Sequence, residues 1–205
     1  MERIVWGMIH TILLFLSLTL SGRATSSSDT VVLLIDFQHD FASTQGAWPA
    51  DSTLSAQAIA SASALVQHAR AKGWPVVRTA NAFSPWDPGN LFRRHAAVRG
   101  TPGARWVMQD TLPNEPLFTK TGSNAFGSDS LSEWFENHPG STIWIAGFFA
   151  EGCALSTAEG ARKRGHRVLS APELVASTDS TRWRKGWQCL RRNGVEGAEV
   201  PFKKH

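Results

Sequence analysis

Val31-Val32-Leu33-Leu34-Ile35-Asp36 is the stretch of sequence that decides the fold. Five consecutive apolar residues leave no polar face, which is typical of a parallel strand that is buried on both sides of a sheet. A helical pattern follows from about Ser52 to Lys72, with apolar residues at helical spacing and Gly73 at its end. A buried strand followed by a helix predicts the first half of a βαβ unit.

The same alternation continues along the rest of the chain. Further strands are expected at 75–79, 117–119, 142–146, 167–170 and 198–200, and helices at 130–137, 153–164 and 184–193. The segment from Asn81 to Thr111 is rich in Pro, Gly and aromatic residues and predicts a long ordered loop with a short helix. Alternating strands and helices predict a parallel sheet with helices on both faces.

The composition indicates one folded domain. The chain has 205 residues, of which 42% are hydrophobic and 19% charged, and this balance favours a globular protein over a disordered one. The formal net charge is +4, with basic residues gathered between Arg182 and Arg192 and at Lys203 and Lys204. No nucleic-acid motif or aromatic platform accompanies them, so we expect a solvated face, with an acidic partner as the alternative, and no nucleic acid.

Residues 1–24 have the layout of a secretory signal peptide. Arg3 precedes an apolar run from Ile4 to Leu20, and small residues occupy Gly22 and Ala24, before a cut after Ala24. An uncleaved membrane anchor is the alternative, because the run is near the lower limit for spanning a bilayer. We therefore expect a secreted or periplasmic domain formed by residues 25–205, with no membrane contact after removal of the signal.

The chain contains two cysteines, Cys153 and Cys189. An even number in an exported protein raises the question of a disulfide. A disulfide would abolish any catalytic role of Cys153, so we expect both cysteines to be free.

Three reactive residue types follow predicted strands. Asp36 and Lys120 each end a strand, and Cys153 begins a helix after the strand at 142–146. Sites in such folds form at the carboxyl ends of strands. A helix N-terminus and a nearby lysine would stabilise a thiolate, and Asp36 could take the thiol proton and later activate water. Taken singly, each residue also has an ordinary structural explanation: a buried cysteine, a capping aspartate and an exposed lysine.

Three motifs occur in order: VLLIDFQHDF (32–41), FTKTGSNAF (118–126) and IAGFFAEGC (145–153). In residues and spacing they resemble the signatures of the isochorismatase-like cysteine hydrolases, the family of isochorismatases and nicotinamidases. The resemblance covers about residues 30–200. It implies a three-layer α/β/α fold, doubly wound around a mostly parallel sheet of about six strands. It also implies a catalytic triad, whose members are Asp36, Lys120 and Cys153.

The resemblance further implies how the substrate is held. A non-proline cis peptide would fall between Phe148 and Phe149, and the N–H groups of Phe149 and Cys153 would form an oxyanion hole. Five residues near the expected rim are predicted to bind substrate: Gln38, Phe41, Phe83, Trp86 and Phe126. The aromatic members could form a pocket for a flat or apolar molecule, or simply pack in the core.

Several positions depart from the family pattern. Ala150 stands where the family usually has Thr, which removes a hydroxyl beside the nucleophile. The metal-binding nicotinamidases carry Asp-x-His after the second strand, and here that region reads Asn81-Ala82-Phe83. We therefore expect no metal and no cofactor, and we expect His39 and His95 to lie at the surface or at the pocket rim.

The main hypothesis is a metal-independent cysteine hydrolase that cleaves a C–N bond of a small amide through a thioester. A second is an isochorismatase-type hydrolase of a vinyl ether, with Asp36 as the acid. A third is an inactive relative that only binds a ligand or partner. Family members often form dimers or tetramers, so the sequence leaves open whether this protein forms a homo-oligomer.

Overall fold

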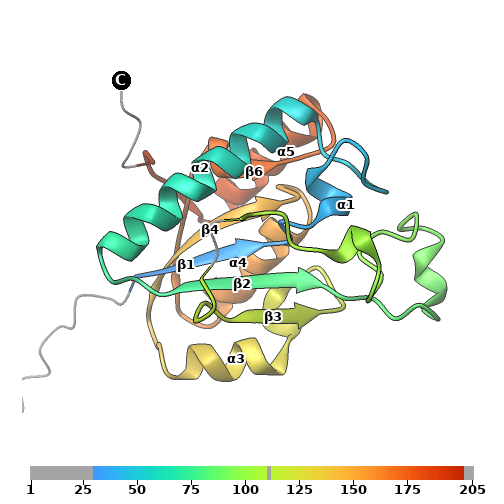
Figure 1. The fold of residues 1–205 in the computed structure, drawn as a ribbon. Coiled ribbons are helices and arrows are strands. Elements are labelled where there is room, and N and C mark those ends of the chain that lie inside the picture. The colour runs from blue at the N-terminus through green and yellow to red at the C-terminus, as the bar shows by residue number, and fades with distance from the viewer. Residues whose placement is uncertain (1–29, 110–111, 201–205) are drawn as a thin grey trace, which may run out of the picture.

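The computed structural model describes residues 30–109 and 112–200, which form a sheet with helices on both faces (Figure 1). The strands are β1 (Thr30–Ile35), β2 (Val76–Asn81), β3 (Leu117–Lys120), β4 (Thr142–Phe148), β5 (Arg167–Ser170), β6 (Val175–Ala176) and β7 (Glu196–Gly197). The helices are α1 (His39–Ala42), α2 (Ser52–Ala71), α3 (Asp129–Glu136), α4 (Cys153–Lys163) and α5 (Ser180–Arg192). The predicted signal peptide, residues 1–24, and the tail lysines lie outside the described residues. Within the described ranges, none of the helices combines the length and apolar character that crossing a membrane requires.

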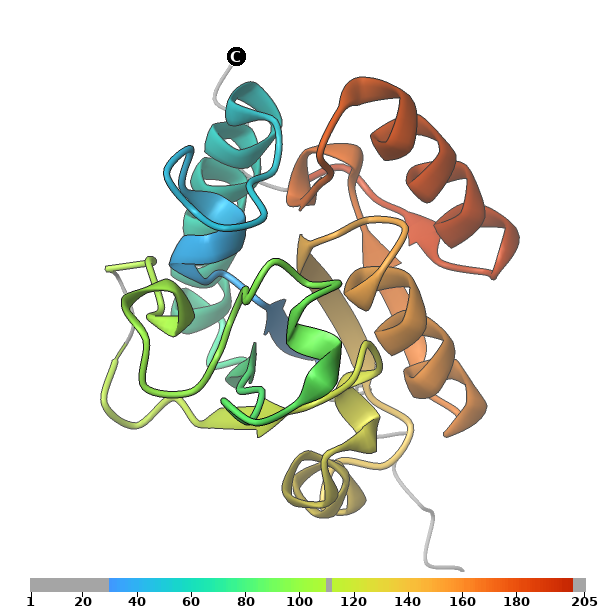
Figure 2. The same ribbon diagram turned by 90° about the vertical axis from the view of Figure 1, so that its right-hand side faces the viewer.

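The sheet has seven strands in the order β3-β2-β1-β4-β5-β7, and β6 pairs with β4. Every pairing is parallel. The chain moves outward from β1 through β2 to β3, and then crosses to β4 and continues outward on the other side. This doubly wound parallel sheet confirms the predicted α/β/α class. Figure 2 looks onto the carboxyl ends of the strands, where the loops that follow the strands gather.

The apolar run that predicted β1 is buried because both of its faces are covered. Val32 and Leu34 belong to the core beneath α2, whereas Val31, Leu33 and Ile35 belong to the core beneath α3, α4 and α5. All five side chains are fully buried. β1 and β4 run so close at their ends that a Cβ on Gly147 would lie 2.1 Å from the carbonyl oxygen of Ile35. The backbone at Gly147, with φ 148°, also suits glycine alone.

The structure corrects several predicted boundaries. The strand expected at 198–200 is wrong: the last strand is β7, and β6 was not predicted at all. Each of these strands has only two residues, too few to make a detectable pattern. α5 begins at Ser180 instead of 184, because the Asp179 carboxylate accepts hydrogen bonds from the N–H groups at the start of the helix. β2 continues two residues beyond its predicted end, to Asn81.

The long loop after β2 is ordered by contacts to α1. The carboxylate of Asp40 accepts a hydrogen bond from Ala97 N of this loop at 2.8 Å, and another from Ala47 N, between α1 and α2, at 3.0 Å. The loop contains short 3₁₀ turns at Pro88–Asn90 and Pro102–Ala104. Part of it projects beyond the carboxyl ends of the strands (Figure 1), so it forms one side of the region where β1, β2 and β3 end.

Candidate active site

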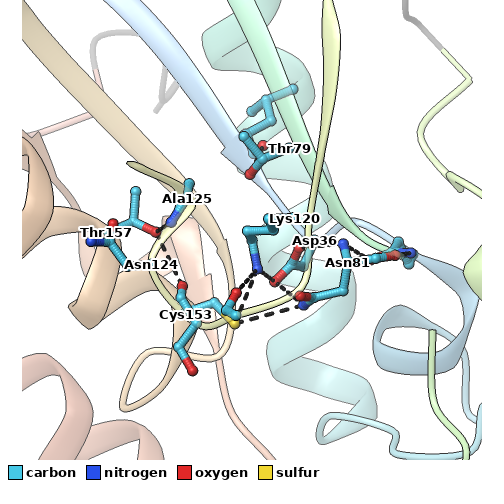
Figure 3. A network of polar contacts seen from close by, with 12 residues as sticks. Asp36, Thr79, Asn81, Lys120, Asn124, Ala125, Cys153 and Thr157 are labelled. Carbon is cyan, nitrogen blue, oxygen red and sulfur yellow. Dashed lines mark hydrogen bonds and ion pairs between the residues drawn. The ribbon is translucent and has the colours of Figure 1, made fainter. Parts of the chain in front are cut away.

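Asp36, Lys120 and Cys153 meet at the carboxyl edge of the sheet (Figure 3). Lys120 Nζ lies 2.8 Å from Asp36 Oδ2 and 3.5 Å from Cys153 Sγ. It also donates to the carbonyl of Gly122 at 3.0 Å. Asp36 follows β1 directly, Lys120 ends β3, and Cys153 begins α4. The three residues singled out in the sequence therefore form one cluster.

Asn81 completes the hydrogen bonding of the Asp36 carboxylate. Its side-chain Nδ2 lies 2.8 Å from Asp36 Oδ2, and its backbone N lies 3.1 Å from Oδ1. Nδ2 also approaches Cys153 Sγ at 3.8 Å. Asn81 can reach both groups because it ends β2, beside β1 and opposite Lys120 in β3. The carboxylate is thus held by one lysine and one asparagine.

Gln38 supports this network from behind and does not face the substrate. Its Oε1 accepts from Asn81 N at 2.8 Å, and its Nε2 donates to the carbonyls of Asn81 at 2.8 Å and Ala104 at 2.9 Å. The side chain is fully buried and does not line the cavity. The prediction of a substrate contact at Gln38 does not fit this placement, because both ends of its amide are already bonded to backbone.

The electrostatics of the cluster differ from the expected activated thiolate. Burial raises the pKa of the Asp36 carboxyl, although Lys120 opposes this shift. Burial and the Asp36 carboxylate raise the pKa of the Cys153 thiol to about 12, despite Lys120 nearby. Burial disfavours the Lys120 ammonium, but Asp36 and Cys153 outweigh it, so its pKa is raised. In the free site Cys153 is therefore a neutral thiol beside the Lys120–Asp36 ion pair.

The segment before Cys153 presents free amide groups. The peptide between Phe148 and Phe149 is cis, as the resemblance implied. The carbonyl of Phe149 accepts from Gly152 N at 2.9 Å and from Ala154 N at 3.2 Å, while Ala150 N donates to Ala176. In the described part of the chain, no backbone hydrogen bond uses the N–H of Phe149 or Cys153. Both groups are therefore free to donate hydrogen bonds to an oxyanion, and their role in catalysis stays a prediction.

A cavity of about 350 Å³ opens above the cluster. Asp36, Asn81 and Cys153 are among the residues that line it. Its aromatic lining consists of Phe41, Trp48, Phe83, Phe148 and Phe149. Phe41 and Phe83 thus lie where the sequence placed them.

Two other predicted rim residues lie outside the cavity lining. Trp86 is 91% exposed on the projecting loop. Phe126 is 3% exposed and packs against Phe135 at a ring-centroid distance of 5.0 Å. Phe126 therefore packs in the core beneath α3, as the alternative of core packing stated. This placement does not fit the expectation that it binds substrate.

The cavity is also lined by charged residues that were not identified as site residues from the sequence. Arg93 pairs with Asp87 at 2.5 Å and lies over the Phe83 ring, 3.9 Å from its centroid. Arg182 lies 4.0 Å from Glu151, and both line the cavity. From the sequence, Arg182 was expected on a solvated basic face, and no prediction was made for Arg93. Glu151 stands within the third motif, two residues before the cysteine, and could have been singled out.

The residues around the cavity do not fit a metal site. The position of the family's first metal ligand is Asn81, whose Nδ2 donates to Asp36, and the position of the second is Phe83, which offers no donor atom. Among residues 30–109 and 112–200, no three His, Cys, Asp or Glu side chains gather as a metal-binding group. His39 is half-buried and His95 is exposed. Cys153 and Cys189 are both free, as predicted.

Solved structures share this fold. A nicotinamidase from Bacillus subtilis superposes with a TM-score of 0.74 at 20% identity, covering 83% of this chain and 99% of that chain. For N-carbamoylsarcosine amidase from Thermoplasma acidophilum the TM-score is 0.72 at 17% identity, with 86% and 99% covered. For the pyrazinamidase of Pyrococcus horikoshii, solved in complex with zinc, it is 0.72 at 21%, with 83% and 99% covered. At these identities the likeness shows a common fold.

Comparison of sequences assigns the family. No curated protein matches the chain. The family model of the isochorismatase domain matches residues 30–200, which include the whole described sheet and the three clustered residues. The chain therefore belongs to the isochorismatase family of hydrolases.

Proposed function

We propose that this protein is a metal-independent cysteine hydrolase that cleaves the C–N bond of a small amide through a thioester. One observation carries the proposal. The Lys120 ammonium lies 2.8 Å from the Asp36 carboxylate and 3.5 Å from the Cys153 thiol, and Asp36 and Cys153 both line a cavity. A base, a nucleophile and a cation that holds both are the parts that acyl transfer to cysteine needs.

In the first half-reaction, the thiol proton moves to Asp36 while Sγ of Cys153 attacks the carbonyl carbon. The developing oxyanion accepts hydrogen bonds from the N–H groups of Phe149 and Cys153. The C–N bond then breaks as the nitrogen takes the proton from Asp36, so ammonia or an amine leaves. Because the pKa of the thiol is raised to about 12, proton removal accompanies attack and does not precede it.

In the second half-reaction, water attacks the thioester carbon and gives a proton to Asp36. The C–S bond breaks, the carboxylic acid leaves, and Sγ of Cys153 recovers the proton. A raised pKa suits Asp36 to this exchange, because the carboxyl can then hold a proton for part of each cycle. Lys120 keeps its charge throughout and holds the carboxylate in place.

The ligand set supports metal independence. Asn81 is committed to Asp36 through Nδ2, and Phe83 presents only an aromatic ring to the cavity. The proposal also retains export directed by residues 1–24, which N-terminal sequencing of the mature protein tests by finding Thr25 first.

A panel of small carboxamides together with isochorismate tests the activity. Wild type, Cys153→Ala and Cys189→Ala are compared, and Cys189 serves as the matched control because it is the second free cysteine and lies on α5. We expect Cys153→Ala to lower amide turnover by about a thousandfold or more, and Cys189→Ala to change nothing. Mass spectrometry should find the acyl group on Cys153 during turnover.

Other outcomes would point elsewhere. Full amide turnover by Cys153→Ala would overturn the thioester route, and isochorismate cleavage without amide cleavage would favour the vinyl-ether alternative. Exhaustive chelation should leave the activity intact. Activity that is lost on chelation and restored by zinc or iron would contradict metal independence.

A further inference from the structure

The side-chain oxygen of Asn81 is buried in the site without a partner. Asn81 is 3% exposed and lines the cavity beside Asp36 and Cys153. Its Nδ2 is used by Asp36 and approaches Cys153, and its backbone N–H is used by Asp36 and Gln38. Oδ1, in contrast, has no hydrogen-bond partner among the described residues. An unpaired buried acceptor is costly, so one at a reaction centre indicates a ligand contact.

The orientation of this amide follows from its neighbour. The carboxylate of Asp36 can only accept, and the atom of Asn81 that lies 2.8 Å from Asp36 Oδ2 must therefore be the nitrogen. The reversed amide would place two oxygens at that distance and turn a donor away from the carboxylate. Oδ1 is consequently fixed as the free atom, and it can accept a hydrogen bond but cannot donate one.

We infer that Asn81 Oδ1 accepts a hydrogen bond from the nitrogen of the scissile amide, so that the enzyme selects substrates with at least one N–H on that nitrogen. The inference rests on the proposed function. The leaving nitrogen takes its proton from Asp36 and must then lie within hydrogen-bond reach of that carboxylate. Asn81 lines the cavity and its carboxamide is bonded to the same carboxylate, so its oxygen lies two covalent bonds from the nitrogen that contacts Asp36.

The contact defines a substrate class. Primary amides, ureides and N-monosubstituted amides carry the required N–H, whereas esters, N,N-disubstituted amides and vinyl ethers do not. Of the other buried polar atoms without partners in residues 30–109 and 112–200, only Nε of Arg93 belongs to a residue that lines the cavity, and it is a donor. It cannot replace Asn81 in recognising an N–H.

Matched substrates separate this role from the support that Asn81 gives to Asp36. The probes are nicotinamide and benzamide, their methyl esters, and their N-methyl and N,N-dimethyl amides. We expect Asn81→Ala to lower kcat/KM for the primary amides about 10- to 100-fold more than for the esters with the same acyl group. Asn81→Asp keeps an acceptor oxygen, so it should slow both substrates while holding the amide-to-ester ratio within about threefold of wild type.

Each result decides a separate point. An equal fall for amides and esters in Asn81→Ala would show that Asn81 only positions Asp36 and would overturn the inference alone. If no amide is hydrolysed by wild type, the proposed function fails and the inference falls with it. Circular dichroism and thermal unfolding confirm that the variants fold. If Asn81→Ala does not fold, Asn81→Asp and wild type provide the test. A large fall in the amide-to-ester ratio of kcat/KM in Asn81→Asp would contradict the inference. Hydrolysis of N,N-dimethyl amides by wild type as fast as N-methyl amides would also contradict it.

Discussion

The ammonium nitrogen of Lys120 lies 2.8 Å from Oδ2 of Asp36, and each side chain is only 1% exposed. A buried ion pair of this kind is weak evidence for stability, since both charges lose their hydration. Breaking it is a different matter, because the remaining charge is left without a partner. Replacing one partner of the pair should therefore change both the stability of the protein and the properties of the site.

Replacing Lys120 by Met should destabilise the protein by about 3–5 kcal/mol at pH 8. The loss should shrink as the pH falls, because the unpaired Asp36 can then take a proton. Urea unfolding at pH 8 and pH 5 measures both effects, and the double variant Asp36→Asn/Lys120→Met is the control that removes the charge. The double variant should be more stable than Lys120→Met at pH 8. Equal stability of the two variants there would show that the Asp36 charge is not buried as described.

The acid limb of the pH–rate profile should report Asp36. Burial raises its pKa above the ordinary value of 3.8. Because the folded-state pKa is raised, the contribution of Asp36 to stability is fully present below pH 3.8 and is lost as the pH rises through the folded value. In the proposed mechanism Asp36 acts as a carboxylate base, so kcat/KM should fall as the pH drops through that same value. Steady-state kinetics in buffers of constant ionic strength measure the midpoint, and a midpoint at or below 3.8 would count against Asp36 as the base.

Alkylation of Cys153 should be slow near neutral pH. The pKa of its thiol is raised to about 12 by burial and by Asp36, so little thiolate is present. Its iodoacetamide labelling rate should keep rising with pH beyond 9. Asp36→Asn removes the negative charge beside the thiol and leaves Lys120, so it should speed labelling at pH 8 by about tenfold or more while abolishing turnover. Peptide mass spectrometry follows Cys153, with Cys189 in the same digest as reference. Unchanged labelling in Asp36→Asn would refute the proposed influence of the carboxylate.

The cluster was predictable from sequence because its members stand at strand ends. The run from Val31 to Ile35 predicts a central strand, and Asp36 follows it without an intervening residue. Parallel strands bring their carboxyl ends to one edge, so Lys120 and the segment before Cys153 had to lie near Asp36. Three motifs in order then fixed the identity of the three residues.

Asn81 was overlooked because the predicted second strand ended at Thr79, which left Asn81 in a loop. In the structure β2 continues to Asn81, and pairing with Lys120 turns its side chain toward Asp36. The raised pKa of Cys153 was also beyond sequence reasoning, since it depends on how deeply the thiol is buried. A helix N-terminus and a lysine suggested the opposite shift. Orientation and burial are tertiary properties, and residue order alone does not specify them.

Ala150 lies close to the backbone of α5 at Gly186. Gly186 approaches so closely that a Cβ on it would lie 2.7 Å from Glu151 N and 2.8 Å from Ala150 Cβ. Ala150 itself is fully buried. The space that a larger residue at 150 would need is therefore occupied by the backbone of α5.

Gly186→Ala should push α5 away from the segment that precedes Cys153. We expect the free energy of unfolding to fall by about 1–3 kcal/mol, as for other overpacked cores, and kcat/KM to fall with it. Ala150→Thr should have a similar effect, because its added atoms enter the same space. Gly127→Ala is the matched control, since a Cβ there meets nothing within 4 Å. Urea unfolding and amide kinetics measure the three variants. A Gly186→Ala protein as stable and active as the Gly127→Ala control would show that α5 does not constrain the segment that precedes Cys153.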